Sequence, residues 1–178
     1  MLNRSLSEYK SDRSYEELQE ILKTTERDFN MELIDKAYRF ALDAHKDQKR
    51  RSGAPYIVHP ISVAYILVEL GMDTESIVAA LLHDVVEDTP TELDTIEKLF
   101  GQDVANLTDG VTKLGKIPYS SREEQQAENL RKMLIAMADD IRVIIIKLAD
   151  RLHNMRTIEF MPEQKRRDKA LETMEVYA

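Results

Sequence analysis

Apolar residues recur three or four positions apart along most of this chain, a spacing that places them on one face of an α-helix. One face of the segment 31–48, for example, carries Leu33, Ala37, Phe40, Ala41 and Ala44. The pattern predicts helices over about 14–29, 31–48 and 60–70, from 73 onward, over 91–101, 103–115 and 141–158, and from 121 and 162 onward. No internal repeat, low-complexity tract or interdomain linker interrupts the series, so it indicates one all-α domain.

Capping residues support these helix boundaries. Ser14 with Glu17, and Ser121 with Glu124, form the capping-box pattern, in which each side chain bonds the backbone amide of the other residue. Further signals at helix starts are Pro60, Asp73 and Pro162, and those at helix ends are Gly71, Gly101 and Gly115. We expect residues 1–13 to be a flexible N-terminus and residues 14–178 to form the folded domain.

The apolar run VIII at 143–146 is ambiguous, because it would also suit a buried strand. No second strand candidate of comparable strength exists to pair with it. We therefore expect a buried helix over 141–158.

Composition narrows the class of protein. The chain has no cysteine, so disulfides and thiolate metal sites are excluded, and any metal must be held by nitrogen and oxygen. No apolar run in the sequence is long enough to cross a bilayer, and the first ten residues lack the apolar core of a signal peptide. A cytoplasmic location without a membrane partner is expected.

The charge pattern bears on the ligand. The chain carries 33 acidic and 25 basic residues, a formal net charge of −8, which argues against broad nucleic-acid binding. Basic residues cluster once, within six positions that contain the single acid Asp47: these are Lys46, Lys49, Arg50 and Arg51. This cluster would suit a small phosphorylated ligand.

The strongest chemical signal is the segment LLHDVVEDT at 81–89. Residues three and four apart on a helix are neighbours, so His83 lies beside Glu87, and Asp84 beside both Glu87 and Asp88. Carboxylates this close repel one another unless a cation or water relieves them, and the His-Asp pair offers ligands to a divalent metal. The alternative is an amphipathic helix with a solvated acidic face, against which the histidine and the apolar preceding turn argue.

A polar stripe on the apolar helix predicted near the end of the chain is the second signal. Lys147, Asp150, Asn154 and Thr157 are spaced three, four and three positions apart. An unpaired buried carboxylate is costly, so the stripe needs a partner. An internal Lys147–Asp150 pair or a solvent-facing stripe would satisfy it, and for Lys147 alone we favour that explanation. For Asp150 we favour a metal ligand, because the His-Asp pair otherwise lacks ligands.

The expected roles of the remaining three histidines depend on the residues near them. His59 lies at a loop-to-helix junction, where a lone histidine is more often a cap or core residue. The His-Asp pair and Asp150 make it a candidate ligand instead. His45 is expected to be structural or at the rim of the site. Helical geometry turns His153 away from the Asp150 stripe, so we expect it to be structural or to support a ligand from behind.

The candidate ligands are therefore His59, His83, Asp84 and Asp150. Two imidazoles and two carboxylates form a nitrogen and oxygen site that suits manganese, iron or zinc better than magnesium. A metal there would lower the pKa of water and polarise a phosphoryl oxygen. Glu87 and Asp88, on the same helix face, could orient that water and accept its proton.

The order and spacing of these residues resemble HD-domain phosphohydrolases, which implies an all-α HD-domain helical bundle. The chain is more specifically similar to the N-terminal hydrolase domain of the long RelA/SpoT homologues, which make and degrade (p)ppGpp, the alarmone of the stringent response. The resemblance covers about 30–178, and its motifs are RRSG at 50–53, PYIVHP at 55–60, HDVVEDT at 83–89, GVTKL at 110–114 and KLADRLHNMRT at 147–157.

This resemblance implies one Mn2+ per domain on the candidate ligands and water activation by Glu87 and Asp88. It implies hydrolysis at the phosphate on the ribose 3′ oxygen of ppGpp or pppGpp, with GDP or GTP and pyrophosphate as products. The residues that would bind the nucleotide or lie near its base are Arg50, Arg51, Ser52, Asn154, Lys147 and Thr157. An arginine plane can stack on guanine as well as neutralise phosphate.

The chain departs from the family in two respects. Arg51 stands where many relatives have lysine, which should preserve phosphate binding. The synthetase and regulatory domains of the long homologues are absent, so we expect a truncated long homologue, with a free-standing small hydrolase as the alternative. Such a chain would hydrolyse the alarmone without making it. The competing functions are an HD phosphohydrolase for another nucleotide and a non-catalytic alarmone-binding module.

Overall fold

The computed structural model describes residues 12–115, 131, 135 and 139–177. Within these residues all regular secondary structure is helical, and the loops contain one isolated bridge between Lys49 and Pro55. Its elements in chain order are α1 (Tyr15–Thr24), α2 (Met31–Ala44), α3 (Val58–Glu69), α4 (Thr74–Asp88), α5 (Leu93–Phe100), α6 (Gln102–Gly115), α8 (Ile141–Arg156), the 3-10 helix η2 (Ile158–Phe160) and α9 (Glu163–Tyr177). The all-α prediction is confirmed.

Helices α3 and α4 form the centre of the bundle. Helix α4 packs against α2, α3, α6 and α8, and most of its side chains between Thr74 and Val85 are buried. Helix α3 is apolar almost all round and packs against α1, α4 and α8. A helix without a polar face belongs in a core, so polar residues on α3 and α4 are held rigidly inside the protein.

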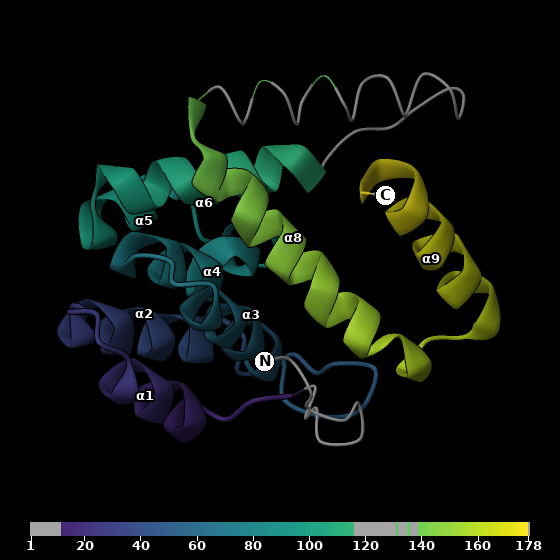
Figure 1. Cartoon of the computed structure of the whole chain (residues 1–178), viewed down its shortest axis with the longest axis horizontal. Coiled ribbons are helices and arrows are strands. Elements are labelled where there is room, and N and C mark those ends of the chain that lie inside the picture. The colour runs from purple at the N-terminus through teal and green to yellow at the C-terminus, as the bar shows by residue number, and fades with distance from the viewer. Residues whose placement is uncertain (1–11, 116–130, 132–134, 136–138, 178) are drawn as a thin grey trace.

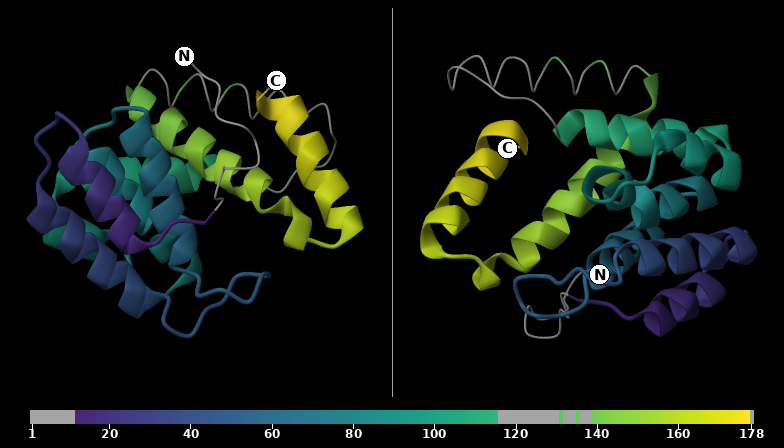
Figure 2. Two further views of the ribbon diagram at one scale, coloured as in Figure 1. Left: turned by 60° about the horizontal axis from the view of Figure 1, so that its bottom comes forward. Right: turned by 180° about the vertical axis from the view of Figure 1, so that it is seen from behind.

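Helix α8 runs diagonally across the bundle and contacts α3, α4 and α6 (Figure 1). The ambiguous apolar run is helical, and Val143, Ile144 and Ile146 are buried in the core, as predicted. Gly110 of α6 permits close packing here, because a Cβ at this position would lie 2.8 Å from Val143 Cγ2. Both views in Figure 2 show α9 beyond α8, at the side of the bundle.

The predicted caps of α1 and α4 are present, whereas α3 begins at Val58, before Pro60, and has no side-chain cap. Ser14 and Glu17 form the capping box of α1, and the Asp73 side chain accepts a hydrogen bond from the Ser76 amide. Gly71 and Gly101 adopt φ angles of 71° and 93°, which favour glycine and end α3 and α5. Two helices are shorter than predicted, since α1 ends at Thr24 and α2 at Ala44. Thr25 follows α1 with extended backbone angles, and His45, which follows α2, is buried although it lies outside the helix.

The helix predicted from Ser121 onward lies outside the described residues, apart from positions 131, 135 and 139. The same holds for residues 1–11 of the segment expected to be flexible. Among the helices that the structure describes, none combines the length and hydropathy needed to span a bilayer.

Candidate metal and active site

His83 and Asp84 lie in the buried middle of α4. His83 is fully buried, and its Nδ1 lies 2.8 Å from the carbonyl oxygen of Ala80. A carbonyl can only accept, so Nδ1 carries a hydrogen, and Nε2 is the ring atom that remains for a metal. Nε2 lies 3.1 Å from Asp84 Oδ1 and therefore faces the carboxylate.

Helices α3 and α8 bring His59 and Asp150 to the same point. One ligand atom each from His59, His83 and Asp150 lies within 4.8 Å of the other two, and all three residues are buried. His59 Nε2 lies 3.2 Å from Asp150 Oδ1 and 3.4 Å from Asp84 Oδ2. The structure thus gathers the four predicted ligands from three separate helices around one small volume.

The electrostatics of this cluster favour a cation. Burial alone would lower the pKa of His83, but the charges of Asp84 and Asp150 raise it to about 9. Burial would raise the pKa of Asp84, yet His83 and His59 hold it below its usual range. The pKa of Asp150 is likewise lowered, against its burial, by His59 and Lys147. Buried carboxylates kept ionised beside imidazoles match the donor set of a transition metal.

Tyr56, which sequence reasoning did not select, bridges the cluster and the predicted catalytic pair. Its hydroxyl lies 2.8 Å from Asp84 Oδ2 and 3.1 Å from Asp88 Oδ2. Burial and the nearby charge of Asp84 raise its pKa, so the hydroxyl stays protonated and can donate. Tyr56 lies in the loop just before α3, within the motif PYIVHP that also contains His59, and its place in that motif was the signal available in the sequence.

Glu87 and Asp88 end α4 beside the cluster. Glu87 is half-buried and Asp88 is exposed, so the pair spans the border between the buried ligands and solvent. The amide of Gln48 donates a hydrogen bond to the Asp88 carbonyl oxygen at 3.0 Å, which ties the end of α4 to the loop after α2.

Lys147 and Asn154 both hold the Asp150 carboxylate. Lys147 Nζ lies 3.0 Å from Asp150 Oδ2, and Asn154 Nδ2 donates to Asp150 Oδ1 at 2.6 Å. Burial opposes the charge of Lys147, but Asp150 and Glu87 outweigh it and raise the pKa of the ammonium. The internal Lys147–Asp150 pair expected from the sequence is present.

The basic loop after α2 meets the end of α8. The Arg50 guanidinium donates hydrogen bonds to Asn154 Oδ1 at 3.2 Å and Thr157 Oγ1 at 3.3 Å. A cavity of about 230 Å3 opens here, and its lining residues are Asp12, Lys49, Arg50, Arg51, Ser52, Tyr56, Thr157, Phe160 and Met161. The structure therefore brings Arg50, Arg51, Ser52 and Thr157 together. Lys147 is absent from this lining and lies against Asp150 instead.

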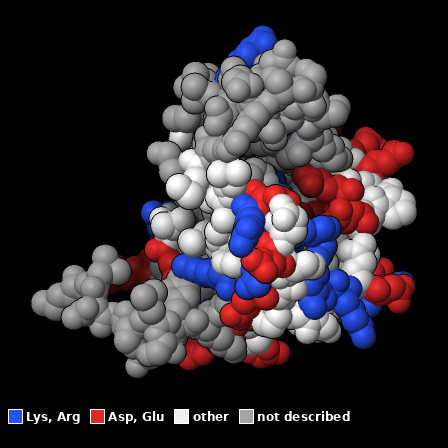
Figure 3. All heavy atoms as spheres, turned by 90° about the vertical axis from the view of Figure 1, so that its right-hand side faces the viewer, with Lys and Arg blue, Asp and Glu red and all other residues white. Residues whose placement is uncertain are grey.

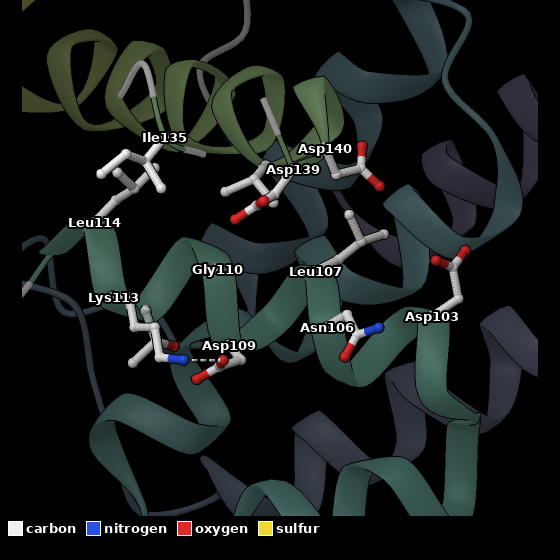
Figure 4. Close-up of a pocket in the computed structure, with 12 residues that line it drawn as sticks. Asp103, Asn106, Leu107, Asp109, Gly110, Lys113, Leu114, Ile135, Asp139 and Asp140 are labelled. Carbon is white, nitrogen blue, oxygen red and sulfur yellow. Dashed lines mark hydrogen bonds and ion pairs between the residues drawn. The ribbon is translucent and has the colours of Figure 1, made fainter. Parts of the chain in front are cut away.

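A larger cavity, of about 690 Å3, lies between α6 and residues 135–143 (Figure 4). Leu107, Leu114 and Ile135 contribute apolar surface, and Asp109 pairs with Lys113 at its edge. Four of its lining residues, Gly110, Thr112, Lys113 and Leu114, belong to the motif GVTKL. None of the predicted metal-binding, catalytic or nucleotide-binding residues lines it, so we place the chemistry at the smaller, basic cavity.

The two other histidines also lie close to the cluster. His153 is buried behind His59, with the two Nδ1 atoms 2.8 Å apart, as expected for a residue that supports a ligand. His45 packs against the Tyr56 ring, with centroids 4.7 Å apart, at the rim of the site. Asp12, Phe160 and Met161 carry no sequence signal, because only the folding of the chain ends brings them to the cavity.

The model of the HD domain family matches residues 37–178, a region that contains every predicted ligand. This chain belongs to the HD domain family. The HD domain is 50% identical over 164 residues to the bifunctional (p)ppGpp synthase/hydrolase SpoT of Escherichia coli K12, covering 92% of this chain and 23% of that protein. It is 54% identical over 147 residues to a guanosine-3′,5′-bis(diphosphate) 3′-pyrophosphohydrolase of Aquifex aeolicus, covering 83% of this chain and 21% of that protein. The chain thus spans little more than a fifth of the length of these relatives.

A solved structure has a similar fold. It is described as a metazoan orthologue of SpoT that hydrolyses ppGpp and plays a role in starvation responses. The HD domain matches it with a TM-score of 0.70 and 32% sequence identity, over 84% of this chain and 86% of that one. The resemblance to the hydrolase domain of RelA/SpoT homologues is thereby confirmed.

Proposed function

We propose that this chain hydrolyses (p)ppGpp to GDP or GTP and pyrophosphate, with Mn2+ as the cofactor, and so takes part in alarmone turnover. The observation that carries the proposal is the buried His59–His83–Asp150 cluster, whose ligand atoms lie within 4.8 Å of one another. Arg50 connects the basic cavity to the cluster. Its guanidinium donates a hydrogen bond to Asn154 of α8, and the Asn154 side chain donates one to Asp150. Relatives named for this activity and this substrate support the assignment.

His59, His83, Asp84 and Asp150 would hold the metal. Two imidazole nitrogens and two carboxylates suit Mn2+ better than Mg2+, which prefers oxygen ligands alone. When bound, the ion would supply positive charge that polarises a phosphoryl oxygen and lowers the pKa of water. Lys147 and Asn154 restrict the Asp150 carboxylate to one orientation toward the cluster.

Glu87 and Asp88 would orient the attacking water and accept its proton. Water attacks the phosphorus attached to the ribose 3′ oxygen, its hydroxyl group stays on phosphorus, and the bond to the 3′ oxygen breaks. The carboxylates accept the proton of the water, and the 3′ oxygen gains a proton as pyrophosphate leaves. Tyr56 would hold Asp88 in position through its hydroxyl, 3.1 Å from Asp88 Oδ2.

The basic loop would bind the nucleotide. Arg50 and Arg51 can neutralise phosphate and stack on the base, and Ser52, Asn154 and Thr157 offer hydrogen bonds. A local site of this kind suits a small anion better than a long polyanion. Figure 3 shows one face on which Lys and Arg side chains lie among Asp and Glu side chains.

A pyrophosphate-release assay tests the proposal. The purified chain is incubated with ppGpp, pppGpp, GTP, dGTP and dGMP in parallel, with Mn2+ and again after chelation. We expect release of pyrophosphate from ppGpp and pppGpp alone, lost on chelation and restored by added Mn2+. Turnover of another nucleotide without turnover of ppGpp would overturn the substrate, and unchanged turnover after chelation would overturn the metal.

A further inference from the structure

His59 is held from behind by a second buried histidine. Its Nδ1 lies 2.8 Å from His153 Nδ1, and both side chains are almost fully buried. Two imidazole nitrogens at this distance form a hydrogen bond only when one of them carries a hydrogen and the other does not. The contact therefore links the protonation pattern of one ring to that of the other.

Asp12 extends this contact to the edge of the protein. His153 Nε2 lies 3.2 Å from Asp12 Oδ1. A carboxylate only accepts hydrogen bonds, so Asp12 favours the form of His153 that carries its hydrogen on Nε2. In that neutral ring Nδ1 has a free lone pair, which accepts the Nδ1 hydrogen of His59. The lone pair of His59 Nε2 is then directed at the carboxylates of Asp84 and Asp150.

The opposite arrangement would oppose metal binding. A His153 ring with its hydrogen on Nδ1 would set two N–H groups against each other, or would force the hydrogen of His59 onto Nε2. A protonated Nε2 cannot bind a metal. The other histidine of the cluster is His83. Its Nδ1 lies 2.8 Å from the Ala80 carbonyl oxygen, which keeps a hydrogen on Nδ1 and leaves Nε2 for the metal.

The chain around Asp12 is anchored on the helix that carries His59. The backbone amide of Arg13 donates to Ser62 Oγ of α3 at 2.9 Å. The guanidinium of Arg13 lies 4.4 Å from the centroid of the Tyr65 ring, also on α3. The next residue, Ser14, caps α1. Asp12 is thus positioned by well-defined contacts, although it belongs to the segment that the sequence led us to expect as flexible.

We propose that Asp12 and His153 are positioning residues, which orient His59 Nε2 toward the cation and strengthen its binding. The inference rests on the proposed metal site and adds to it a supporting chain that reaches the N-terminal segment. Partners of this kind, which bond the second nitrogen of a ligating histidine, typically change metal affinity about 10–100-fold.

Titration of the metal-free chain with Mn2+ tests the proposal, with free Mn2+ measured by electron paramagnetic resonance and no nucleotide present. We expect Asp12→Ala to weaken Mn2+ binding about 10-fold, and Asp12→Asn to weaken it less, because the amide oxygen still accepts a hydrogen bond. Asp28→Ala, which removes an exposed carboxylate between α1 and α2, is the control matched for charge and should bind as the wild type does.

Substitution of His153 provides a second arm. His153→Leu removes the acceptor and should weaken Mn2+ binding about 10–100-fold. His153→Asn keeps an acceptor close to the position of Nδ1 and should restore much of the affinity. Circular dichroism of the metal-free variants checks that each is folded. Should His153→Leu fail to fold, the comparison of Mn2+ affinity between Asp12→Ala and Asp12→Asn still tests the positioning role.

Nuclear magnetic resonance of the imidazole nitrogens gives a direct readout of the arrangement. In the chain loaded with diamagnetic Zn2+, we expect a slowly exchanging hydrogen on Nδ1 of His59, which exchanges faster with solvent in Asp12→Ala. Wild-type Mn2+ affinity in Asp12→Ala and His153→Leu would overturn the positioning role alone. Absence of Mn2+ binding by the wild type would overturn the metal site and this inference with it.

Discussion

The hydroxyl of Tyr56 lies 2.8 Å from Asp84 Oδ2, inside the buried cluster of predicted metal ligands. The same hydroxyl lies 3.1 Å from Asp88 Oδ2, so one side chain connects a predicted ligand to a predicted catalytic carboxylate. Because Tyr56 and Asp84 belong to different parts of the chain, this link couples the loop before α3 to the end of α4.

Replacement of Tyr56 by Phe should weaken both metal binding and hydrolysis. The ring still packs, but Asp84 and Asp88 lose their shared donor, so we expect Mn2+ affinity to fall about 10-fold. Isothermal titration with Mn2+ and the pyrophosphate-release assay measure the two effects. Tyr65→Phe, on α3 and outside the cluster, keeps the ring that contacts Arg13 and should behave like the wild type. Equal behaviour of the two variants would exclude a role for the Tyr56 hydroxyl.

Glu87→Gln and Asp88→Asn should separate hydrolysis from binding. Both changes keep size and polarity but remove the proton acceptors, so we expect the rate of hydrolysis to fall about 10²–10⁴-fold. Mn2+ binding and nucleotide binding should persist within a few-fold, as measured by calorimetry. Glu92→Gln, an exposed change just after the site, serves as the control. Unaltered turnover in both variants would remove this pair from the mechanism.

Addition of Mn2+ should stabilise the fold, because the buried cluster binds the ion only when folded. At a free ion concentration 100-fold above Kd, the gain is about 2.7 kcal/mol. For a chain of this size that corresponds to a rise in Tm of roughly 5–10 °C. Differential scanning calorimetry should show this rise in the wild type and in Asp94→Asn, an exposed change on α5, but not in Asp150→Asn. A rise of the same size in Asp150→Asn would place the ion elsewhere.

Arg142 should stabilise the junction of α4, α6 and α8. Its guanidinium lies 2.8 Å from Asp73 Oδ2, 2.9 Å from Asp103 Oδ1 and 2.7 Å from Asp140 Oδ2. These groups are partly exposed, so we expect Arg142→Gln to lower the free energy of unfolding by only about 1–2 kcal/mol at pH 7. Denaturation in urea measures it. Arg39→Gln, which breaks an exposed pair with Asp35, should change stability by less than about 0.5 kcal/mol.

The stabilisation by Arg142 should disappear in acid. Hydrogen bonds from Arg142 lower the pKa of Asp140, and for Asp73 the bonds from Ser76 and Arg142 outweigh burial and lower the pKa as well. A carboxyl whose pKa is lower in the folded state stabilises fully above its unfolded pKa, about 3.9 for Asp, and progressively less as the pH falls below it. The difference between the wild type and Arg142→Gln should therefore be constant from pH 6 to 8 and shrink below about pH 4. A constant difference down to pH 3 would contradict this account.

Much of the fold could be predicted from the sequence, because caps and apolar periodicity act within one helix. The capping box of Ser14 and the N-cap of Asp73 form where local rules place them. The identity of the candidate ligands was also accessible, since His83 and Asp84 are adjacent and the family motif includes His59 and Asp150. Local rules were weaker at the ends of α1 and α2, because no glycine or proline marks either end and the chain leaves the helix while its side chains, such as His45, still pack inside.

Contacts between distant segments were decided by the packing of helices alone. Tyr56 reaches Asp84, and Asp12 reaches His153, because α1, α3, α4 and α8 pack around one core. Sequence periodicity specifies which face of a helix is buried, but not which residue of another helix stands opposite it. Whether two residues on different helices form a hydrogen bond depends on the distance between their donor and acceptor atoms to within a few tenths of an ångström. The sequence alone therefore predicted which residues are candidate ligands, whereas the tertiary structure determined which side chains hold them in place.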